Sequence, residues 1–568
     1  MPSRREQALA ALRAAAGIDV LIVGGGVHGA GTFRDLALQG VRCVLVERDD
    51  FAAGASGAST RMAHGGIRYL ETGQFRLVRE ALLERNRLLR NAPHLVTPIQ
   101  VAIPTRGLWA GSFAALARLL GWNGRGSTPG LILLLLGLWL YDRLDRRGRL
   151  LPRVGFAHGR KARALLPEAR PGIDGLGWMW DGRIRHPERL VWELIEDGLV
   201  AMPDGIALNH CALASRDGDA LIVRDAIGGE TFRVRPRIVI NAAGAWADKV
   251  HRLLGLEPGT VTASQGTHLF LENDALRAAL DGRLIYFADA RGRMCMLYAI
   301  EEQVLLGTTD LPVDDADAAA AGEDEIAYLL DAARSLFPSI AIDAAQIRFT
   351  TCGVRSLKKV TGGEIGAASR DYAISQRDLA HDRSFALLTL VGGKWTTFRA
   401  AAESLTDAAL SRLGRSRVVT TSATPIGGGC DFPVDTAARR RWSQTQSART
   451  GLPVERLSVL FDRYGTRAAA VAAFCAAAPD RPIDGAPGFT EREVRFLVAQ
   501  EMCATLEDVI LRRTTLALGG TIGQDAISGI GRIIEQESGA ALPPEAVDAF
   551  AAELAARHGV DIRAPVSA

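Results

Sequence analysis

The sequence lacks the cysteine patterns that build disulfide frameworks or zinc sites. Its seven cysteines are scattered over 568 residues, and no two of them form a CxxC pair. Disulfide-stabilised domains and zinc sites use several closely spaced cysteines. The pattern therefore argues against both kinds of site, predicts no metal, and is typical of a protein from a reducing compartment.

A long hydrophobic run is also missing. The longest one, LILLLLGLWLY at residues 131–141, has eleven residues, whereas a membrane-spanning helix needs about 20. Near the N-terminus, Glu6 and Arg13 interrupt any apolar stretch, so we expect no signal peptide. The sequence does not predict an ordinary transmembrane protein.

An excess of charge of one sign is missing as well. The net charge is +3 although 23% of the residues are charged, so nothing at the level of the whole chain points to a nucleic-acid partner. There is no internal repeat and no low-complexity segment. With 48% hydrophobic residues the composition is globular, and the length predicts two or three domains.

What the sequence does contain, close to its N-terminus, is a βαβ pattern. Residues 18–23 form an aliphatic run that predicts a buried strand, residues 30–38 predict a helix, and residues 42–47 predict a second strand. The turn between the first strand and the helix reads Gly24-Gly25-Gly26-Val27-His28-Gly29. This turn matches the GxGxxG motif of dinucleotide-binding folds.

Each residue of the motif has a physical role in binding a dinucleotide. Gly24 permits the tight turn, Gly26 lets the backbone approach a pyrophosphate, and Gly29 lets helix and strand pack closely. The helix N-terminus offers free N–H groups to the phosphates, and Glu47 can accept hydrogen bonds from a ribose. The motif alone does not separate FAD from NAD, and a glycine turn in an unrelated α/β core is the alternative.

Small and hydroxyl-bearing residues crowd the segment after the second strand, GASGASTRMAHGGIRYL at residues 54–70. Its hydroxyl-bearing residues are Ser56, Ser59 and Thr60. Such a stretch suits backbone that passes close to a long, flat cofactor, which favours FAD. The alternative, a flexible glycine–serine loop, fits poorly with the embedded His64, Arg68 and Tyr69.

The rest of the chain predicts further domains. Residues 261–350 alternate strand-like pieces with a helix at 323–337, which predicts a second, antiparallel substrate domain inserted into the nucleotide domain. Residues 491–518 carry apolar residues at helical spacing. We expect an α/β protein with an N-terminal extension (1–17), a discontinuous FAD-binding domain (18–255 and 350–424), an inserted α+β capping domain (256–349) and a helical C-terminal domain (425–568).

Nine motifs, in this order, resemble those of the FAD-dependent glycerol-3-phosphate dehydrogenases of the aerobic, membrane-associated kind. They are IVGGGVHGAG (22–31), HGGIRYLE (64–71), FRLVREALLER (75–85), NAPHL (91–95), NAAGAWAD (241–248), LLGTTD (305–310), CGVRSL (352–357), SRDYAI (369–374) and GGKWTTFR (392–399). The patterns HGGxRYLE and GGKxTT are especially specific to this family. The resemblance covers about residues 19–518.

The resemblance implies a glutathione-reductase-type FAD domain with a substrate-capping domain and a helical C-terminal domain. It implies hydride transfer from carbon 2 of sn-glycerol 3-phosphate to flavin N5, which yields dihydroxyacetone phosphate; electrons then pass to a quinone or, in oxidase members, to oxygen. The residues that it places at the active site are Arg68, Tyr69, His268, Arg355, Arg370 and Lys394. Besides the residues of the first βαβ unit and the serine-rich segment, it implies cofactor contacts from His64, Gly65, Gly66, Gly244, Asp310, Gly393, Lys394 and Thr396.

The chemistry of these side chains agrees with such a reaction. A phosphate dianion binds guanidinium groups in bidentate geometry, as Arg355 and Arg370 could offer. Oxidation of an alcohol needs a base for the hydroxyl proton, and the ordinary pKa of a histidine suits His268 to this task. Lys394 could place a positive charge near flavin N1 and O2, where reduced flavin is negative.

The sequence departs from the family pattern at a few positions. Arg61 stands where a lysine or a similar residue is usual. The usual GVRPL reads GVRSLKK here, which adds Lys358 and Lys359, and residues 181–190 differ from the usual stretch. These changes leave open another polyol phosphate, such as erythritol phosphate, as the substrate. Other classes that remain open are an amine or amino-acid oxidase, a non-catalytic flavin-binding protein and an NAD-linked dehydrogenase.

Residues 113–149 combine apolar residues, Trp139, Tyr141 and flanking arginines. This composition suits either a membrane-surface contact or a buried core helix with a solvated basic end. Because the resemblance implies a quinone acceptor, we expect a cytoplasmic protein that associates peripherally with the inner face of the cell membrane. The oligomeric state stays open, with a homodimer as one option.

Overall fold

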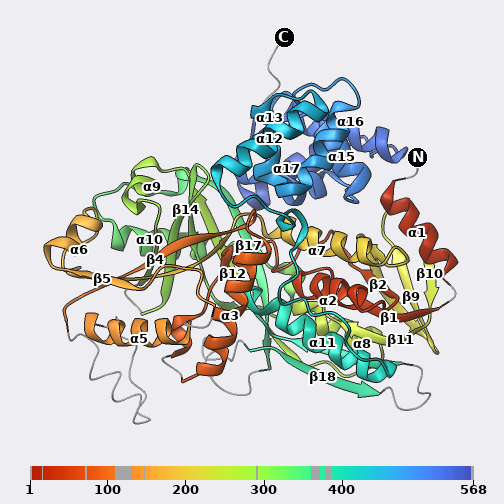
Figure 1. The fold of residues 1–568 in the computed structure, drawn as a ribbon, viewed down its shortest axis with the longest axis horizontal. Coiled ribbons are helices and arrows are strands. Elements are labelled where there is room, and N and C mark those ends of the chain that lie inside the picture. Colours follow the sequence, from red (N-terminus) through yellow and green to blue (C-terminus); the bar gives the residue numbers. More distant parts are fainter. Residues whose placement is uncertain are drawn as a thin grey trace.

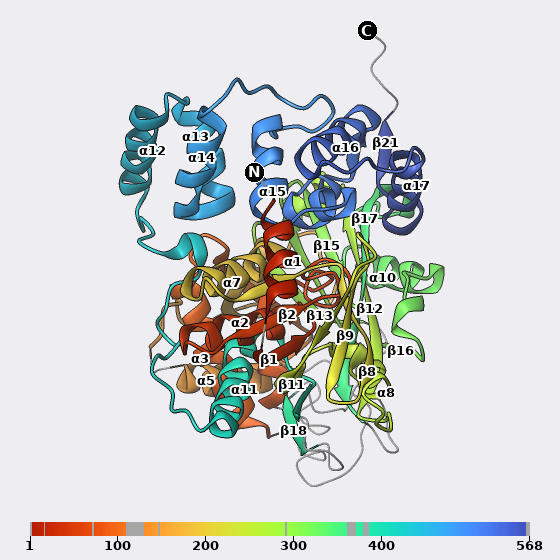
Figure 2. The ribbon, with the colours of Figure 1, turned by 90° about the vertical axis from the view of Figure 1, so that its right-hand side faces the viewer.

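The computed structural model describes residues 3–15, 17–70, 73–108, 130–145, 148–289, 292–359, 371–378 and 385–563. Two large β-sheets lie side by side in this part of the chain (Figure 1). A group of helices near the C-terminus lies above both sheets (Figure 2). The expected α/β fold with a helical C-terminal domain is confirmed.

The first sheet contains the predicted βαβ unit. Its described strands follow the order β18 (Ala373–Asp378), β19 (Ala386–Val391), β11 (Pro236–Asn241), β1 (Ile18–Val23), β2 (Cys43–Val46) and β7 (Ile206–Leu208). Neighbouring strands are parallel except for β18 and β19. The central strand β1 is aliphatic because both of its faces are covered.

Helices cover one face of this sheet and a small antiparallel sheet covers the other. The helices are α2 (Val27–Leu38), α7 (Pro187–Ala201) and α11 (Phe398–Leu413), and the small sheet holds β8 (Cys211–Asp217), β9 (Ala220–Asp225) and β10 (Thr231–Val234). Val20 and Ile22 join the core on the helix side, whereas Leu21 and Val23 join the core on the other side. This alternation is the period of two that a strand imposes.

The second sheet contains ten of the described strands. They are β3 (Met62–Ala63), β4 (Val96–Thr105), β5 (Gly155–His158), β6 (Gly175–Ile184), β12 (Val261–Leu271), β13 (Leu284–Ala288), β14 (Met294–Ile300), β15 (Gln303–Gly307), β16 (Leu311–Pro312) and β17 (Ile347–Lys358). Helices α6 (Arg160–Leu165), α9 (Asp274–Leu280) and α10 (Glu323–Leu336) pack on one face, and α3 (Phe75–Asn91) and α5 (Leu131–Leu144) on the other.

This sheet extends beyond the range 256–349 that the sequence predicts for the capping domain. Strands β3 to β6 come from the part of the chain before residue 185, and β17 runs past residue 349. Hydrophobic periodicity shows where a strand lies but not which strand it pairs with. The pairing of β4 with β13 joins residues about 180 positions apart and leaves no local signal.

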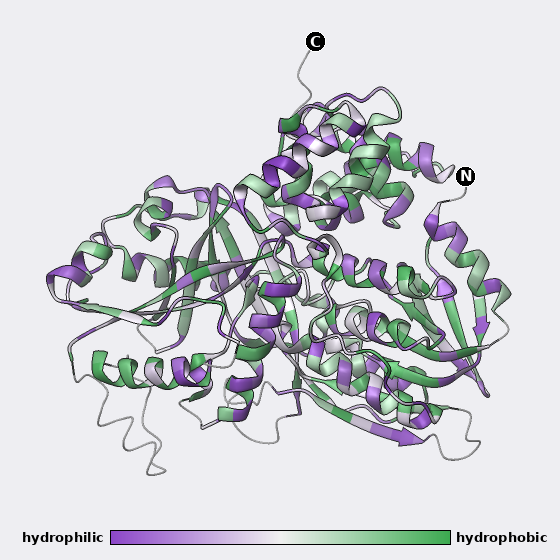
Figure 3. Cartoon of the chain, in the orientation of Figure 1, coloured by the Kyte–Doolittle hydropathy of each residue, from purple (hydrophilic) through white to green (hydrophobic). Residues whose placement is uncertain are grey.

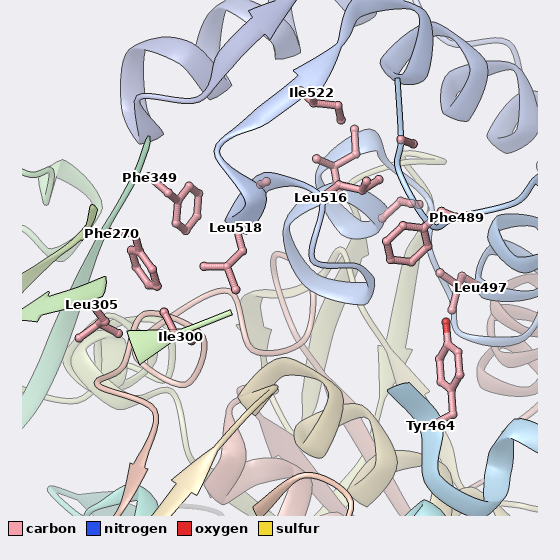
Figure 4. Packing of buried hydrophobic residues seen from close by; sticks show 14 of the residues in the cluster. Phe270, Ile300, Leu305, Phe349, Tyr464, Phe489, Leu497, Leu516, Leu518 and Ile522 are labelled. Atoms are coloured by element: carbon pink, nitrogen blue, oxygen red, sulfur yellow. The ribbon is translucent and has the colours of Figure 1, made fainter. Parts of the chain in front are cut away.

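The C-terminal region is helical, as expected. It contains α12 (Thr436–Thr450), α13 (Val454–Tyr464), α14 (Ala468–Ala476), α15 (Glu491–Gln500), a π-helical turn (Asp508–Arg513), α16 (Gln524–Ser538), α17 (Ala546–His558) and the short strands β20 (Thr521–Gly523) and β21 (Asp561–Arg563). Phe270 and Phe349 of the second sheet point toward Leu518 (Figure 4), and all three belong to one hydrophobic cluster. The core is therefore continuous between the second sheet and the helical region.

Candidate active site

Backbone atoms approach the glycine-rich turn after β1 closely at two positions, Gly24 and Gly29. Gly24 has a φ of +112°, and a Cβ atom there would lie 2.6 Å from the carbonyl oxygen of Ala242, at the end of β11. A Cβ atom on Gly29 would overlap the carbonyl oxygen of Gly24. Both positions therefore require glycine for close approach of backbone, as the motif predicts.

The first turn of α2 and the segment after β2 are joined by hydrogen bonds. Ser56 Oγ accepts a hydrogen bond from the backbone N–H of Val27 at 2.9 Å. The Glu47 carboxylate accepts from the N–H groups of Gly25 at 2.6 Å and Asp49 at 3.0 Å, and burial raises its pKa. A Cβ atom on Gly26 would meet only Ser56 Oγ, at 3.1 Å, within 4 Å. The direct contacts of Gly26 and Glu47 with a cofactor stay predictions.

The HGG motif and the GGK motif meet although they are more than 300 residues apart. The backbone N–H of His64 donates to Thr396 Oγ1 at 3.0 Å, and Trp395 Nε1 donates to the carbonyl oxygen of Ser56 at 2.9 Å. Lys394 Nζ lies 3.5 Å from the centroid of the Tyr69 ring. A cation over an aromatic face is attracted by the ring quadrupole, so the loop after β19 and the turn Ile67–Leu70 form one unit.

Arg355 lies across the middle of β12. Strand β17 pairs with β12 so that Arg355 faces Ser264, and a Cβ atom on Gly266 would overlap its guanidinium. The guanidinium donates to Thr308 Oγ1 at 2.9 Å, to the carbonyl oxygen of Thr309 at 3.2 Å and to Asp310 Oδ1 at 3.3 Å. Gly266 thus leaves the space in which the charged group of Arg355 is held.

His268 lies two residues beyond Gly266 on the same face of β12. Successive residues on one face of a strand are about 7 Å apart, so imidazole and guanidinium are neighbours. Burial, together with the positive charges of Arg355 and Arg61, lowers the pKa of His268 to about 3. Among the described residues, neither ring nitrogen has a hydrogen-bond partner. The structure therefore holds a buried imidazole with a lowered pKa, whose nitrogens make no hydrogen bond to the described residues.

The structure also describes several of the other predicted residues. Ser59 Oγ accepts from the N–H of Arg61 at 3.2 Å, and the carbonyl oxygen of Thr60 accepts from Tyr298 Oη at 3.0 Å. Gly244 begins a 3-10 turn whose Trp246 ring flanks Gly54. Arg68 is exposed to solvent. Arg370 lies outside the described residues.

Two groups that the sequence does not assign to the site also belong to it. Arg61 is buried with a φ of +52°, donates to the carbonyl oxygen of Arg185 at 3.0 Å and to Glu188 Oε1 at 3.1 Å, and acts electrostatically on His268. The one sequence signal that points to Arg61 is that the family usually has a lysine or a similar residue at this position. Tyr141 and Asp181 contact Gly65. The sequence marks Tyr141 only as part of the apolar segment 113–149 and Asp181 only as the start of the departing stretch 181–190, and neither pattern predicts a contact with Gly65.

Comparison with known proteins identifies the family. A family model described as FAD dependent oxidoreductase matches residues 19–408, and a second, described as the C-terminal domain of alpha-glycerophosphate oxidase, matches residues 419–541. The chain belongs to the FAD-dependent oxidoreductases.

Relatives of this oxidoreductase share most of its length. It is 33% identical to a glycerol-3-phosphate dehydrogenase of Synechocystis, over 92% of this chain and 93% of the relative. It is 29% identical to a D-erythritol 1-phosphate dehydrogenase of Brucella abortus, over 87% and 94%. The structure of a glycerol-3-phosphate dehydrogenase from Bacillus halodurans complexed with FAD has the same fold, with a TM-score of 0.73, 23% identity and coverage of 98% and 97%.

The residues of this oxidoreductase fit FAD. The turn at Gly24 and the N-terminus of α2 form the close backbone approach that a pyrophosphate needs. The segment that precedes the HGG loop also approaches β17, because a Cβ atom on Gly353 would lie 2.4 Å from the carbonyl oxygen of Ala58. Among the described residues, no group of three or more His, Cys, Asp or Glu side chains could hold a metal ion.

Proposed function

We propose that the protein oxidises the C2 hydroxyl of sn-glycerol 3-phosphate to the ketone of dihydroxyacetone phosphate and passes the electrons to a quinone. The observation that carries the proposal is that the guanidinium of Arg355, on β17, lies over Gly266 of β12, two residues from His268, and lowers the pKa of His268. A phosphorylated alcohol needs a base and a phosphate-binding cation within the reach of one small molecule. The relatives named as glycerol-3-phosphate dehydrogenases support the substrate.

In this proposal each side chain has one task. Arg355 binds the phosphate, and it must exchange its contact with Asp310 for the dianion, which is the stronger partner. A ring nitrogen of His268 accepts the hydroxyl proton of C2. FAD supplies the hydride acceptor at flavin N5, so the C2 hydrogen leaves with both bonding electrons. Lys394, held against Tyr69, offers positive charge beside the flavin.

Arg370 is the second arginine of the proposed phosphate site, and only the resemblance to the family places it there. Two arginines suit a dianion better than one, because each can bind two oxygens. The direct cofactor contacts of Gly65, Gly66, Gly244, Gly393 and Thr396 belong to the same proposal.

Helix α5 supports the proposed contact with a membrane. Leu134 and Leu138 are buried against β6, whereas Ile132, Leu136 and Trp139 on the opposite side are 38%, 61% and 53% exposed. Figure 3 shows α5 as a largely hydrophobic helix at the lower edge of the molecule. An exposed apolar stripe with an arginine, Arg143, stacked on Trp139 suits the boundary of lipid headgroups and acyl chains.

Within the described residues, no helix is long and apolar enough to cross a bilayer. The remainder of the expected membrane segment, residues 113–129 together with Arg146 and Arg147, lies outside the described residues. The proposed membrane contact supports a quinone acceptor, because it would bring the protein to the bilayer in which the quinone pool is dissolved.

A second candidate substrate is erythritol phosphate. The Brucella abortus relative named as a D-erythritol 1-phosphate dehydrogenase covers almost the same length with similar identity. Both reactions use the same base and the same phosphate site, and they differ only in the length of the polyol.

Anaerobic bleaching of the bound flavin tests the proposal. We expect sn-glycerol 3-phosphate to bleach the flavin fastest, erythritol phosphate more slowly and glycerol hardly at all. Replacing Arg355 by Ala should raise KM for glycerol 3-phosphate about tenfold to a hundredfold, because a charge-assisted hydrogen bond is worth about 1.5–3 kcal/mol. Arg348→Ala is the matched control, because Arg348 lies on the same strand but pairs with Glu272 at the surface.

Two results of this experiment would contradict the proposed function in different ways. If erythritol phosphate bleaches the flavin fastest, the substrate assignment changes to the longer polyol. If dithionite bleaches the flavin but no polyol phosphate does, the proposed reaction is wrong.

A further inference from the structure

The backbone N–H of Gly65, in the HGG motif, is held by two side chains from distant parts of the chain. It lies 3.2 Å from Tyr141 Oη on α5 and 3.3 Å from Asp181 Oδ1 on β6, and donates to both. Tyr141 Oη in turn donates to Asp181 Oδ1 at 2.7 Å. Burial and the neighbouring Asp181 carboxylate raise the pKa of Tyr141 well above its ordinary value, which keeps this hydroxyl protonated as a donor.

Arg85 fixes the positions of Tyr141 and Asp181. Its guanidinium donates to Asp181 Oδ1 at 2.9 Å and to Asp145 Oδ2, just beyond the end of α5, at 2.8 Å. All four side chains, including Tyr141, are buried. A buried polar network with its partners satisfied resists displacement, so helices α3 and α5 and strand β6 hold Tyr141 Oη and Asp181 Oδ1 in place.

The network sets the position of the loop that follows Gly65. Gly66 has a φ of +72°, and a Cβ atom there would meet the Tyr69 ring at 2.5 Å and Lys394 Nζ at 3.6 Å. On the other side, the N–H of His64 is bound by Thr396 Oγ1. The segment 64–69 is thus clamped between Tyr141 with Asp181 on one side and Thr396 on the other. This clamp places the face of the Tyr69 ring against Lys394 Nζ.

We propose that Tyr141 and Asp181 are positioning residues, which act through the N–H of Gly65 to hold Tyr69 and Lys394 in the geometry of the reaction. The catalytic part of this inference rests on the proposed function, since that assigns Tyr69 and Lys394 to the site. In this proposal, the backbone of the HGG loop carries the effect of Tyr141 and Asp181, because both side chains accept a hydrogen bond from the N–H of Gly65.

The test uses Tyr141→Phe in the FAD-loaded protein, which removes one hydroxyl and keeps the ring. Three quantities are measured: hydrogen–deuterium exchange of peptides that span residues 62–70, the visible circular dichroism of the bound flavin, and the limiting rate of flavin reduction by glycerol 3-phosphate. We expect exchange in this segment to become about tenfold faster, which corresponds to one lost hydrogen bond. The flavin circular dichroism should change, and the reduction rate should fall at least tenfold while the KM for substrate changes less than about twofold.

Tyr464→Phe is the matched control. Tyr464 is as deeply buried as Tyr141, and its Oη donates to the Glu493 carboxylate at the same distance, 2.7 Å, in the helical region. This variant should lose similar stability without any change at residues 62–70 or in the flavin spectrum. Asp181→Asn, which keeps the shape of the side chain, should reproduce the effects of Tyr141→Phe.

The inference is overturned if Tyr141→Phe behaves like Tyr464→Phe in exchange and in circular dichroism, or if exchange accelerates while the flavin signals stay unchanged. If wild-type flavin is not reduced by any polyol phosphate, the proposed function fails, and exchange together with circular dichroism still decides whether the clamp positions the flavin environment.

Discussion

The environment of His268 decides when this residue can act as a base. A base must be unprotonated, and in the ligand-free protein the pKa of His268 is about 3, because burial and two guanidinium groups oppose its charged form. An ordinary histidine would impose a limb near neutrality. Here the lowered pKa keeps His268 unprotonated at neutral pH, and a phosphate dianion bound to Arg355 should raise its pKa by cancelling positive charge.

This reasoning predicts two different pH profiles for the proposed reaction. The limiting rate of flavin reduction should rise with pH through the pKa of His268 in the substrate complex, which lies above 3. The profile of kcat/KM should instead show a limb near pH 6 from the second ionisation of the substrate phosphate. In His268→Gln we expect the limiting rate to fall about 10²-fold and to lose its acid limb, while the limb of kcat/KM persists. Stopped-flow reduction between about pH 4 and pH 9 measures both, and an unchanged limiting rate would assign the base to another group.

At the level of elements, the loop after β2 is locked by the helical region. Asp50 lies three residues beyond Glu47 and is fully buried. Arg513 donates to its two carboxylate oxygens at 2.6 and 3.0 Å, and Arg512 Nε donates to Oδ2 at 2.9 Å. The same loop contacts the glycine turn, because the N–H of Ala52 donates to the carbonyl oxygen of Gly25 at 3.1 Å. The π-helical turn thus contacts the nucleotide-binding loop.

Asp50→Asn should therefore weaken both folding and cofactor binding. The substitution leaves two buried guanidinium groups without their carboxylate, which costs about 3–5 kcal/mol of stability. Because Glu47 is on the same loop, we also expect the Kd of FAD to rise at least tenfold. Thermal unfolding and titration of apoprotein with FAD measure the two effects. Glu493→Gln is the control, since Glu493 is equally buried and binds Arg456 and Arg463 within the helical region; it should lower Tm and leave the Kd of FAD unchanged.

The two faces of α5 predict different consequences of substitution. Changing Leu136 and Trp139 to Glu should abolish co-sedimentation with anionic liposomes at low salt and leave the fold intact, because both side chains are more than half exposed. Leu134→Glu should instead unfold the helix, since Leu134 packs against Gly177 of β6. Failure of the wild-type protein to sediment with these liposomes would contradict the membrane contact and favour oxygen as the acceptor.

At the scale of the whole molecule, sequence predicts what is local. The strand–glycine–helix order predicts Gly24 and Gly29, because one common motif marks both. The overlap at Gly29 is local, with Gly24, whereas the carbonyl oxygen that closes on Gly24 belongs to Ala242, far away in the chain. The apolar run at 131–141 left a core helix and a membrane contact open, and α5 has one face suited to each. The network around Gly65 could not be predicted, because Tyr141 and Asp181 lie 76 and 116 residues away in the chain. Only the sheet and helix packing bring them to the motif.

Neighbouring atoms pack closely around the chain where it joins the nucleotide-binding domain to the helical region. This joint is formed by the turn Gly427–Gly429. A Cβ atom on Gly428 would overlap the carbonyl oxygen of Tyr464, and one on Gly427 would overlap the Glu193 carboxylate. That carboxylate already accepts from the N–H of Gly428 at 3.1 Å and contacts His94 Nε2 at 2.8 Å. With a hydrophobic cluster that continues from Phe349 to Leu518, this joint should make the described domains unfold together.

Gly428→Ala should make the nucleotide-binding domain and the helical region unfold in separate transitions. The added methyl group must push backbone from backbone, which costs at least the 1–3 kcal/mol or so of an overpacked core. Calorimetry should then resolve a helical-region transition at lower temperature than the main one, and limited proteolysis should cut near residue 427. Gly519→Ala is the control, because a Cβ atom there meets nothing within 4 Å. If the two variants unfold alike in one transition, the close packing at Gly428 does not couple the domains, and the shared hydrophobic cluster alone must hold them together.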